Sequence, residues 1–502
     1  MYDQGSFAEE LARLNTVCTL GLDLGTSSAK AVVADIGGRV LAQASAGYAV
    51  TSAVAGYAES EPAHWWSAMT ACAREAVHAA GAWPTAIGLS GQMHGLVMAS
   101  AAGEALRPAL LWADSRATGC LHAYRLLGSR ALARLANPLA PGMTGPLLMW
   151  IAEHEPRTYT EARWALLPKD WLRARLTGEV YAEPSDASAT LLYDVMGDRW
   201  DREVVNALGL DASLLAPLLP SAGMPAGHLV AEAGTDLGLP AGIPVAAGAA
   251  DTAAAALGSG VGPGDVQLTV GTGAQVIRPL AAPVSRADAG VNLYRSATLD
   301  GWYHMGATLS AGLSLNWVRE SMNATWAELY ASANHPGRAH DPIFVPHLAG
   351  ERTPYSDPGL RGSWTGLSLA ADRVSLLRSA LEGTAFSIRD ALDALVTDQR
   401  PPRLRLAGGG TLAASWRQLL ADVLGLPLYA VDVPAASGRG AALLGAHAAG
   451  LLSFDDIQGP LAPPARLAAE PDPTAAAFHA ERYAAFRRTV SALRGCSAAG
   501  PA

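Results

Sequence analysis

Short apolar runs that end in glycine-rich polar turns alternate with longer amphipathic stretches along this chain. Residues 17–46 have the pattern strand, turn, strand, turn, strand, and residues 86–89 and 243–247 add two short buried strands. Pro62 lies just inside a predicted helix start, a position that tolerates proline. A C-terminal helix is predicted by an apolar stripe at Tyr483, Phe486, Val490 and Leu493. This alternation predicts an α/β fold.

Two glycine-threonine turns, far apart in the chain, each follow one strand-like run and precede another. They consist of Gly25, Thr26 and Ser27 in the first and Gly271, Thr272 and Gly273 in the second. Glycine permits the tight reversal and lets backbone N–H groups approach an anion, while the hydroxyls add donors. Only the first turn follows an acid, Asp23, which suits the metal ion of a bound polyphosphate. The repetition predicts a duplicated, two-lobed phosphotransferase.

A third glycine-rich turn, which includes Gly409 and Gly410, follows another strand-like run and precedes a predicted helix over 413–424. A glycine turn at a helix start allows a phosphate or adenosine to lie against the backbone, so we expect these two glycines to contact a nucleotide. The alternative for the Asp23 turn taken alone is an ordinary hairpin, because Asp and Gly are common turn residues.

Asp251 is the candidate general base. A hydroxyl that attacks phosphorus must lose its proton, and a carboxylate within hydrogen-bond reach can accept it. The alternative is a structural N-cap, because Asp often fills that position before a helix. We favour the base because Asp251 lies near a predicted domain boundary at 250–262, where a cleft would form.

Two polar loops are candidates for a sugar site. They contain Gln92, Met93 and His94 in the first and Trp112, Asp114 and Arg116 in the second. Polar side chains on a glycine-flanked loop after a strand suit sugar hydroxyls, although a loop histidine can also be a satisfied structural residue. The acid and base of the second loop form either part of the pocket or a structural ion pair.

The length and composition limit the class of protein. A chain of 502 residues, half of them hydrophobic, predicts two domains, which we place at 17–255 and 256–495. The net charge of −9 without long charge runs argues against nucleic acid as a partner. The chain has only two lysines and no GxxxxGK[ST] motif, which excludes a P-loop kinase.

The same features predict a cytoplasmic enzyme. No apolar run approaches the ~20 residues that a membrane span needs, and Met1 to Thr16 lacks the pattern of a signal peptide. The four cysteines are scattered and show no metal-binding spacing, which is typical of reduced thiols in a cytosolic protein.

Taken together, the motifs resemble those of the FGGY carbohydrate kinases, and within that family the xylulokinases. The resemblance covers about Val17 to Arg494. Besides the two candidate sugar loops, it rests on segments 166–170, 185–187 and 350–354.

The resemblance implies two actin-like domains of the ribonuclease H type that close on a cleft. It implies that Asp251 is the catalytic base, that Met93 and His94 contact the sugar, and that Asp23 supports Mg²⁺ and phosphate. The sugar would bind mainly to the N-terminal domain and ATP mainly to the C-terminal one. The implied nucleotide-lining glycines are Gly271, Gly273, Gly409 and Gly410.

Three positions depart from the family pattern. Leu147 stands where a lysine is usual, Thr252 where xylulokinases have asparagine after the base, and Ser375 where an acid or amide is usual. None of the three removes a catalytic carboxylate.

The resemblance therefore implies ATP-dependent phosphorylation of D-xylulose to D-xylulose 5-phosphate, with Mg²⁺ as cofactor. The alternatives are a kinase for another ketose or polyol (ribulose, gluconate or 1-deoxy-xylulose) and a nucleotide-driven switch of the actin or Hsp70 kind. The switch gives no reason for the Gln-Met-His loop. The oligomeric state is left open, with a homodimer as one alternative.

Overall fold

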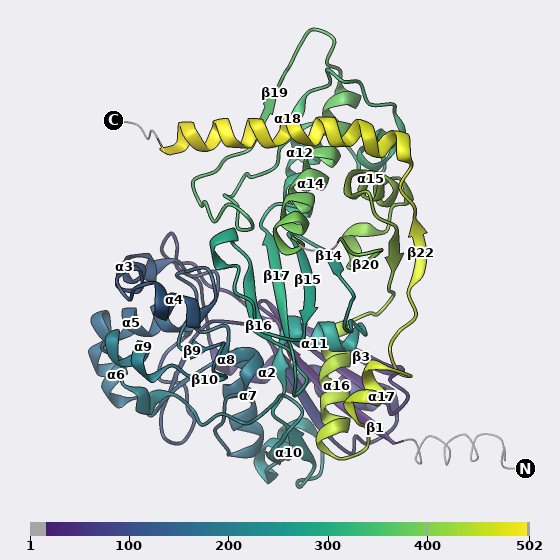
Figure 1. The fold of residues 1–502 in the computed structure, drawn as a ribbon. Helices are drawn as coiled ribbons and strands as arrows, with labels where there is room; N and C mark the ends of the chain where they lie inside the picture. Colours follow the sequence, from purple (N-terminus) through teal and green to yellow (C-terminus); the bar gives the residue numbers. More distant parts are fainter. Residues whose placement is uncertain (1–16, 398–399, 499–502) are drawn as a thin grey trace, which may run out of the picture.

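Each lobe of the computed structural model is built around one mixed, seven-stranded sheet (Figure 1). The structure describes residues 17–397 and 400–498, so the expectation for Met1 to Thr16 lies outside the described residues. The strands of the first sheet are β1 (Cys18–Leu24), β2 (Ser28–Asp35), β3 (Val40–Gly47), β5 (Ile87–Gly91), β11 (Pro225–His228), β12 (Pro244–Ala246) and β13 (Ala249–Ala250). Those of the second are β14 (Gln267–Val270), β15 (Ala274–Leu280), β16 (Asn292–Arg295), β17 (Trp302–Thr308), β20 (Leu404–Ala407), β21 (Leu428–Ala430) and β22 (Arg466–Ala469).

The two sheets repeat one strand arrangement. In the first, β1, β2 and β3 form an antiparallel meander, and β5 lies parallel to β1 on its other side. In the second, β14, β15 and β17 pair antiparallel in the same way, and β20 lies parallel to β14. Each glycine-threonine turn joins the first two strands of its meander. The structure thus has the mixed α/β, two-lobed fold that the sequence predicts.

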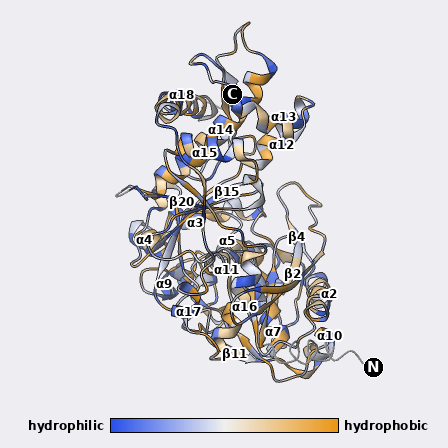
Figure 2. Cartoon of the chain, turned by 90° about the vertical axis from the view of Figure 1, so that its right-hand side faces the viewer, coloured by the Kyte–Doolittle hydropathy of each residue, from blue (hydrophilic) through white to orange (hydrophobic). Residues whose placement is uncertain are grey.

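Helices cover the sheets of both lobes. In the first lobe they are α2 (Pro62–Ala80), α7 (Pro168–Thr177), α10 (Ala231–Leu237), α11 (Asp251–Gly258) and α16 (Ala436–Ala448). In the second they are α12 (Gly312–Ser321), α14 (Arg373–Leu395), α15 (Ala414–Leu424) and α18 (Pro473–Ala498). Peripheral helices such as α2 mix hydrophilic and hydrophobic residues along their length (Figure 2), as expected of helices with one buried face.

An insertion of short elements enlarges the first lobe. Its helices are α3 (Leu121–Arg125), α4 (Ser129–Leu135), α5 (Thr144–His154), α6 (Pro156–Glu161), α8 (Pro184–Ala187) and α9 (Arg202–Ala207). Its strands form two-stranded sheets. These are β4 (Glu59–Ser60) with β7 (Ala109–Leu110), β6 (Val97–Ala99) with β8 (Trp164–Leu166), and β9 (Tyr193–Asp194) with β10 (Arg199–Trp200).

The late helix α16 returns to the first lobe, where it packs on β1 and β5, while α18 lies across the top of the second lobe (Figure 1). The fit is close enough that a Cβ added at Gly21 on β1 would lie 1.9 Å from the carbonyl oxygen of Gly438. Glycine is therefore required for this contact between strand and helix. As a result, the first lobe combines N-terminal strands with a helix from the C-terminal half of the sequence.

Several predicted elements are confirmed. Helix α2 begins at Pro62, β5 covers the predicted strand near 86–89, and α15 covers the predicted helix after the third glycine turn. The apolar stripe on α18 packs in the core of the second lobe, with Tyr483, Phe486 and Val490 buried and Leu493 partly buried. Among residues 17–397 and 400–498, no helix has the length and apolar character needed to cross a membrane.

Candidate active site

The candidate carboxylates meet at the carboxyl ends of three parallel strands. Strand β5 pairs with β1 on one side and with β13 on the other, with Ser90 in register with both Asp23 and Ala249. Asp251 follows β13 directly, so the chain places Asp23, the loop after β5 and Asp251 at one edge of the sheet. Ligands of α/β proteins bind at this edge.

Asp251 is the first residue of α11, and Ala250 occupies the N-cap position. Asp251 is therefore not the N-cap of α11, and the alternative of a purely structural N-cap does not apply to it. The Thr252 hydroxyl donates a hydrogen bond to Oδ1 of Asp251 at 3.2 Å. Burial, followed by the negative charge of Asp23, raises the pKa of Asp251 from 3.8 to about 7. A carboxylate with this pKa can accept a proton from an alcohol near neutral pH.

Asp23 lies at the end of β1 and is buried. The Ser90 hydroxyl donates a hydrogen bond to its Oδ1 at 3.0 Å. Burial raises the pKa of Asp23, and the charge of Lys30 and this hydrogen bond partly oppose the rise. Among the described residues, no cluster of three or more acidic, histidine or cysteine side chains could hold a metal on its own. A lone carboxylate suits Mg²⁺, which is often bound by one or two carboxylates plus substrate phosphates and water.

His94 is held as a neutral hydrogen-bond acceptor. Its Nδ1 lies 2.7 Å from the carbonyl oxygen of Ala189, which can only accept, so Nδ1 carries the proton and Nε2 keeps a free lone pair. Burial lowers the pKa of His94 to about 4. Its φ of 65° is in the left-handed region, which is uncommon outside glycine and often marks functional loops. Met93 beside it is buried.

Gln92 connects two parts of the candidate site. We call the loop of Gln92, Met93 and His94 the sugar loop, and the turn of Gly25, Thr26 and Ser27 the first phosphate turn. The Nε2 of Gln92 donates to the carbonyl oxygen of Gly25 at 3.3 Å, and its backbone N–H donates to Leu24. Its Oε1 is buried without a hydrogen-bond partner in the described structure. A buried acceptor without a partner costs free energy, which a ligand donor would recover.

The second sugar-loop candidate divides into two parts. Trp112 is partly exposed, and its indole N–H donates to the Thr26 hydroxyl of the phosphate turn at 2.9 Å. Asp114 instead accepts from the backbone N–H of Ala58 at 2.7 Å and pairs with Arg116 at 2.8 Å. Arg116 also pairs with Glu59 at 2.8 Å. This geometry favours the structural ion-pair alternative for Asp114 and Arg116.

The second turn, Gly271 to Gly273, supports the start of α12. The carbonyl oxygens of Gly271 and Thr272 accept from the backbone N–H groups of Gly312 and Ala311 at 3.0 and 3.1 Å. A Cβ added at Gly409 would meet no atom within 4 Å, and one at Gly271 would meet only an oxygen at 4.0 Å. These glycines border open space that side chains would fill, which fits a nucleotide lying against the backbone.

Other residues of the site could not be inferred from local pattern. Tyr48 on the loop after β3 donates its hydroxyl to the carbonyl oxygen of Gly25 and so braces the first phosphate turn. Lys169 is fully buried, with Nζ 2.7 Å from Oδ1 of Asp170 and 3.4 Å from Oδ2 of Asp186. Segments 166–170 and 185–187, on which the family resemblance partly rests, contain Lys169, Asp170 and Asp186, but their pairing with one another depends on tertiary packing.

The remaining departures from the family pattern have structural roles. Leu147 is fully buried in the apolar cluster under α5. Ser375 forms a reciprocal capping box with Asp372 at the start of α14. Neither side chain belongs to the edge of the sheet where the carboxylates meet.

The chain is similar in sequence and fold to known sugar kinases. The chain is 34% identical to the xylulose kinase of Lactococcus lactis subsp. lactis over 453 residues, which are 88% of this chain and 89% of that protein. A crystal structure described as a xyloylose kinase from Brucella ovis is 33% identical, with a TM-score of 0.89 over 95% of this chain and 100% of that one. A gluconate kinase from Lactobacillus acidophilus, at 24% identity and a TM-score of 0.90 over 95% and 98% of the two chains, shares the fold.

The sequence patterns of the family cover both lobes. The N-terminal domain pattern of the FGGY family of carbohydrate kinases matches residues 18–258, and the C-terminal domain pattern matches residues 266–449. These matches, together with a relative above 30% identity over most of its length, confirm the resemblance: the chain belongs to the FGGY family of carbohydrate kinases.

Proposed function

We propose that this enzyme transfers the γ-phosphoryl group of ATP to the 5-hydroxyl of D-xylulose, giving D-xylulose 5-phosphate and ADP. The observation that carries the proposal is the position of Asp251, a half-buried residue whose carboxyl pKa is raised to about 7, at the same sheet edge as the Met93 and His94 loop. Relatives above 30% identity are xylulose kinases, which supports xylulose as the acceptor.

Each residue has one role in this reaction. The 5-hydroxyl oxygen attacks the γ-phosphorus in line, its proton passes to Asp251, and the bond between the γ-phosphorus and ADP breaks. The Nε2 atom of His94 accepts a hydrogen bond from a sugar hydroxyl, and Met93 packs on the carbon chain. The two glycine-threonine turns and Gly409 hold the nucleotide, which places ATP between the lobes.

Mg²⁺ would be held by Asp23 and the phosphates, and it would neutralise their charge. Exclusion of water by the two lobes would suppress hydrolysis of ATP. The cytoplasmic location, the homodimer and the domain limits at 17–255 and 256–495 stay predictions.

A substrate panel tests the proposal. ADP release is measured with D-xylulose, D-ribulose, 1-deoxy-D-xylulose, D-gluconate and glycerol, and ³¹P NMR locates the phosphate on the product. We expect the highest kcat/KM with D-xylulose and a phosphate ester at the 5-oxygen. A higher kcat/KM with another acceptor would overturn the choice of sugar, and no sugar-dependent ADP release would overturn the kinase activity.

A further inference from the structure

The loop between β18 (Ile343–Val345) and β19 (Ser363–Thr365) carries Arg352 on a rigid support. The neighbouring Glu351 is 2% exposed, and its Oε1 accepts from the backbone N–H groups of Leu309 at 2.8 Å and Arg352 at 2.7 Å. Its Oε2 lies 3.0 Å from Nδ1 of His347. The side chain of Glu351 is therefore used entirely to fix the loop, and its charge is not paired with the Arg352 guanidinium.

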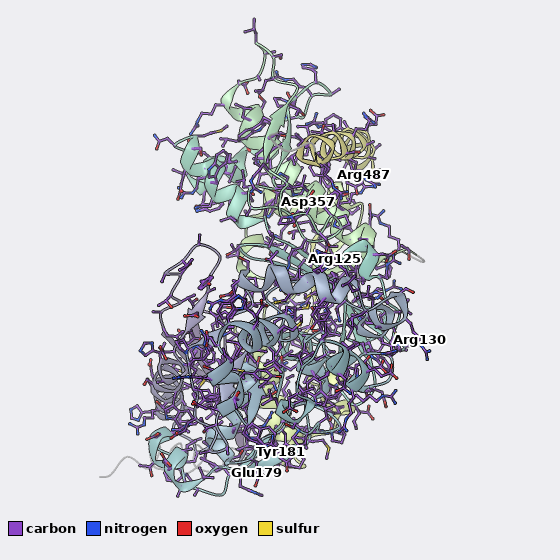
Figure 3. The ribbon with its side chains drawn as sticks, turned by 90° about the vertical axis from the view of Figure 1, so that its left-hand side faces the viewer. Arg125, Arg130, Glu179, Tyr181, Asp357 and Arg487 are labelled. Carbon is purple, nitrogen blue, oxygen red and sulfur yellow. The ribbon has the colours of Figure 1, made fainter. Side chains whose placement is uncertain are left out.

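The residue on the other side of Arg352 is fixed equally well. The backbone N–H of Thr353 donates to the carbonyl oxygen of Ala307 at 3.0 Å, and the Thr353 hydroxyl accepts from the N–H of Ala307 at 3.0 Å. Ala307 is the penultimate residue of β17, next to the second phosphate turn. Arg352 thus projects from a loop tied to the central sheet of the second lobe. Figure 3 shows Asp357, from the segment that follows Arg352, in that upper lobe.

The guanidinium of Arg352 reaches toward the first lobe. Its Cζ lies 5.9 Å from the ring centroid of Trp112, whose indole N–H is bonded to Thr26 of the first phosphate turn. Its positive charge acts on His94, whose pKa is lowered first by burial and then by Arg352. Arg352 therefore lies near Trp112, which contacts the first glycine-threonine turn, and close enough to His94 to act on its charge.

This guanidinium has no carboxylate within ion-pair distance in residues 17–397 and 400–498. Two other arginines near the site differ in this respect, because Arg116 and Arg173 are each paired with an aspartate. An arginine whose backbone is fixed near this turn, and whose guanidinium charge is unpaired, suits a planar and bidentate contact with phosphate oxygens.

We propose that Arg352 contacts the phosphoryl group while it passes from ATP to the sugar. This proposal rests on the proposed kinase function and adds a catalytic residue to it. The bond to ADP breaks, the bond to the sugar oxygen forms, the proton goes to Asp251, and Arg352 stays protonated throughout. Because Arg352 belongs to one lobe and Trp112 to the other, the contact also links closure of the lobes to transfer.

The first test compares Arg352→Ala and Arg352→Lys with Arg361→Ala. Within the described part of the chain, the guanidinium of the nearby Arg361 bonds to the carbonyl oxygens of Pro358 and Leu360 and to no other group. We expect Arg352→Ala to lower kcat by about 10²-fold with a small change in sugar KM, because the contact is made in the transition state. Arg352→Lys should keep part of the rate, and added guanidinium ion should restore part of the activity of Arg352→Ala. Wild-type kcat in Arg352→Ala would overturn the proposal.

The second test does not depend on which sugar is used. The affinity for Mg²⁺–ADP with aluminium fluoride, which imitates the transferring phosphoryl group, is measured by calorimetry beside that for Mg²⁺–ADP alone. We expect Arg352→Ala to weaken the first by at least about tenfold and the second by less than about twofold, because a charge-assisted contact is lost only with the phosphoryl mimic. Equal weakening of both, or of neither, would overturn the assignment of Arg352, whereas a wild type inactive on every sugar would overturn only the proposed function.

Discussion

The Ser185 hydroxyl accepts a hydrogen bond from the backbone N–H of Ala250 at 3.0 Å, and Ala250 immediately precedes Asp251. The same hydroxyl donates to Oε1 of Glu183 at 2.7 Å. Glu183 also caps α8 by accepting from the backbone N–H groups of Ser185 and Asp186. The start of α11, and with it the candidate base, is therefore fixed by a buried hydrogen-bond chain from a different helix.

A buried charge cluster lies behind this chain. Lys169 faces Asp170, Glu183 and Asp186, and all four are almost fully buried. Both carboxyl oxygens of Asp186 lack a hydrogen-bond partner in the described structure, and burial raises its pKa well above the ordinary value. Buried charges are costly unless they are paired and hydrogen-bonded. The cluster adjoins the candidate base through Glu183, which accepts from the Ser185 hydroxyl.

Ser185→Ala should destabilise the protein and slow catalysis. It leaves the buried N–H of Ala250 without an acceptor, which costs about 1–3 kcal/mol in the free energy of unfolding. The start of α11 can then shift, so we also expect a lower kcat. Urea unfolding and steady-state kinetics measure both effects, with Ser67→Ala on the exposed face of α2 as the control. Unchanged kcat in a destabilised Ser185→Ala protein would limit this residue to a structural role.

The rate should depend on pH through Asp251. The base must be deprotonated, and its pKa is raised to about 7, so kcat/KM should fall as the pH decreases through about 7. The limiting slope is about tenfold per pH unit. A rate that stays flat between pH 5 and 8, with sugar and ATP binding unchanged, would contradict the assignment of Asp251 as the base.

Asp23→Asn provides a specific check on that profile. The negative charge of Asp23 contributes to the raised pKa of Asp251, so its removal should move the acid limb to lower pH. The two enzymes are compared by the pH at the midpoint of the acid limb and not by the maximum value of kcat/KM. The maximum should fall in Asp23→Asn because loss of Asp23 should also reduce activity at ordinary Mg²⁺ concentrations. An unmoved limb would show that the two carboxyl groups do not interact.

Asp251→Asn should be nearly inactive and more stable than the wild type at alkaline pH. Loss of a general base typically lowers the rate by ~10²–10⁴-fold, whereas binding of ATP should be unchanged. A carboxyl group whose pKa is higher in the folded chain stabilises it below the unfolded pKa, and this is lost as the pH rises through about 7. The gain in Tm of Asp251→Asn should therefore be largest above pH 7 and fade toward pH 4. The exposed Asp300→Asn is the control, and an equal gain at all pH values would argue against a raised pKa.

The sequence allowed the candidate residues to be predicted near one another because the motifs that carry them are local. The glycine-threonine turns and the Gln92 to His94 loop each follow a strand directly, and strand ends of parallel pairs meet at one edge. The duplicated architecture could be predicted for the same reason, since one turn pattern occurs in each half.

Contacts between distant segments could not be predicted in this way. Whether Asp114 and Arg116 face a sugar or each other depends on Ala58 and Glu59, which lie just before and at the start of β4. The link from Ser185 to Ala250 depends equally on tertiary packing. Patterns along the chain show which types of side chain lie near a strand end. They do not show which of these side chains form ion pairs or hydrogen bonds with distant segments.

The choice of sugar should depend on His94 as a neutral acceptor. Because Nδ1 is bonded to Ala189, only Nε2 can accept from a sugar hydroxyl. His94→Asn removes that acceptor, and asparagine tolerates the φ of 65° better than most residues do. We expect kcat/KM for D-xylulose to fall by roughly 5- to 150-fold, which corresponds to the ~1–3 kcal/mol cost of an unpaired polar group, with little change in KM for ATP. The loss should be constant between pH 6 and 9, because the pKa of His94 is lowered to about 4. His78→Asn, at the exposed end of α2, is the matched control. A loss that varies with pH in this range would mean that protonated His94 takes part, and an equal loss with every acceptor in the panel would mean that it positions the loop and does not select the sugar.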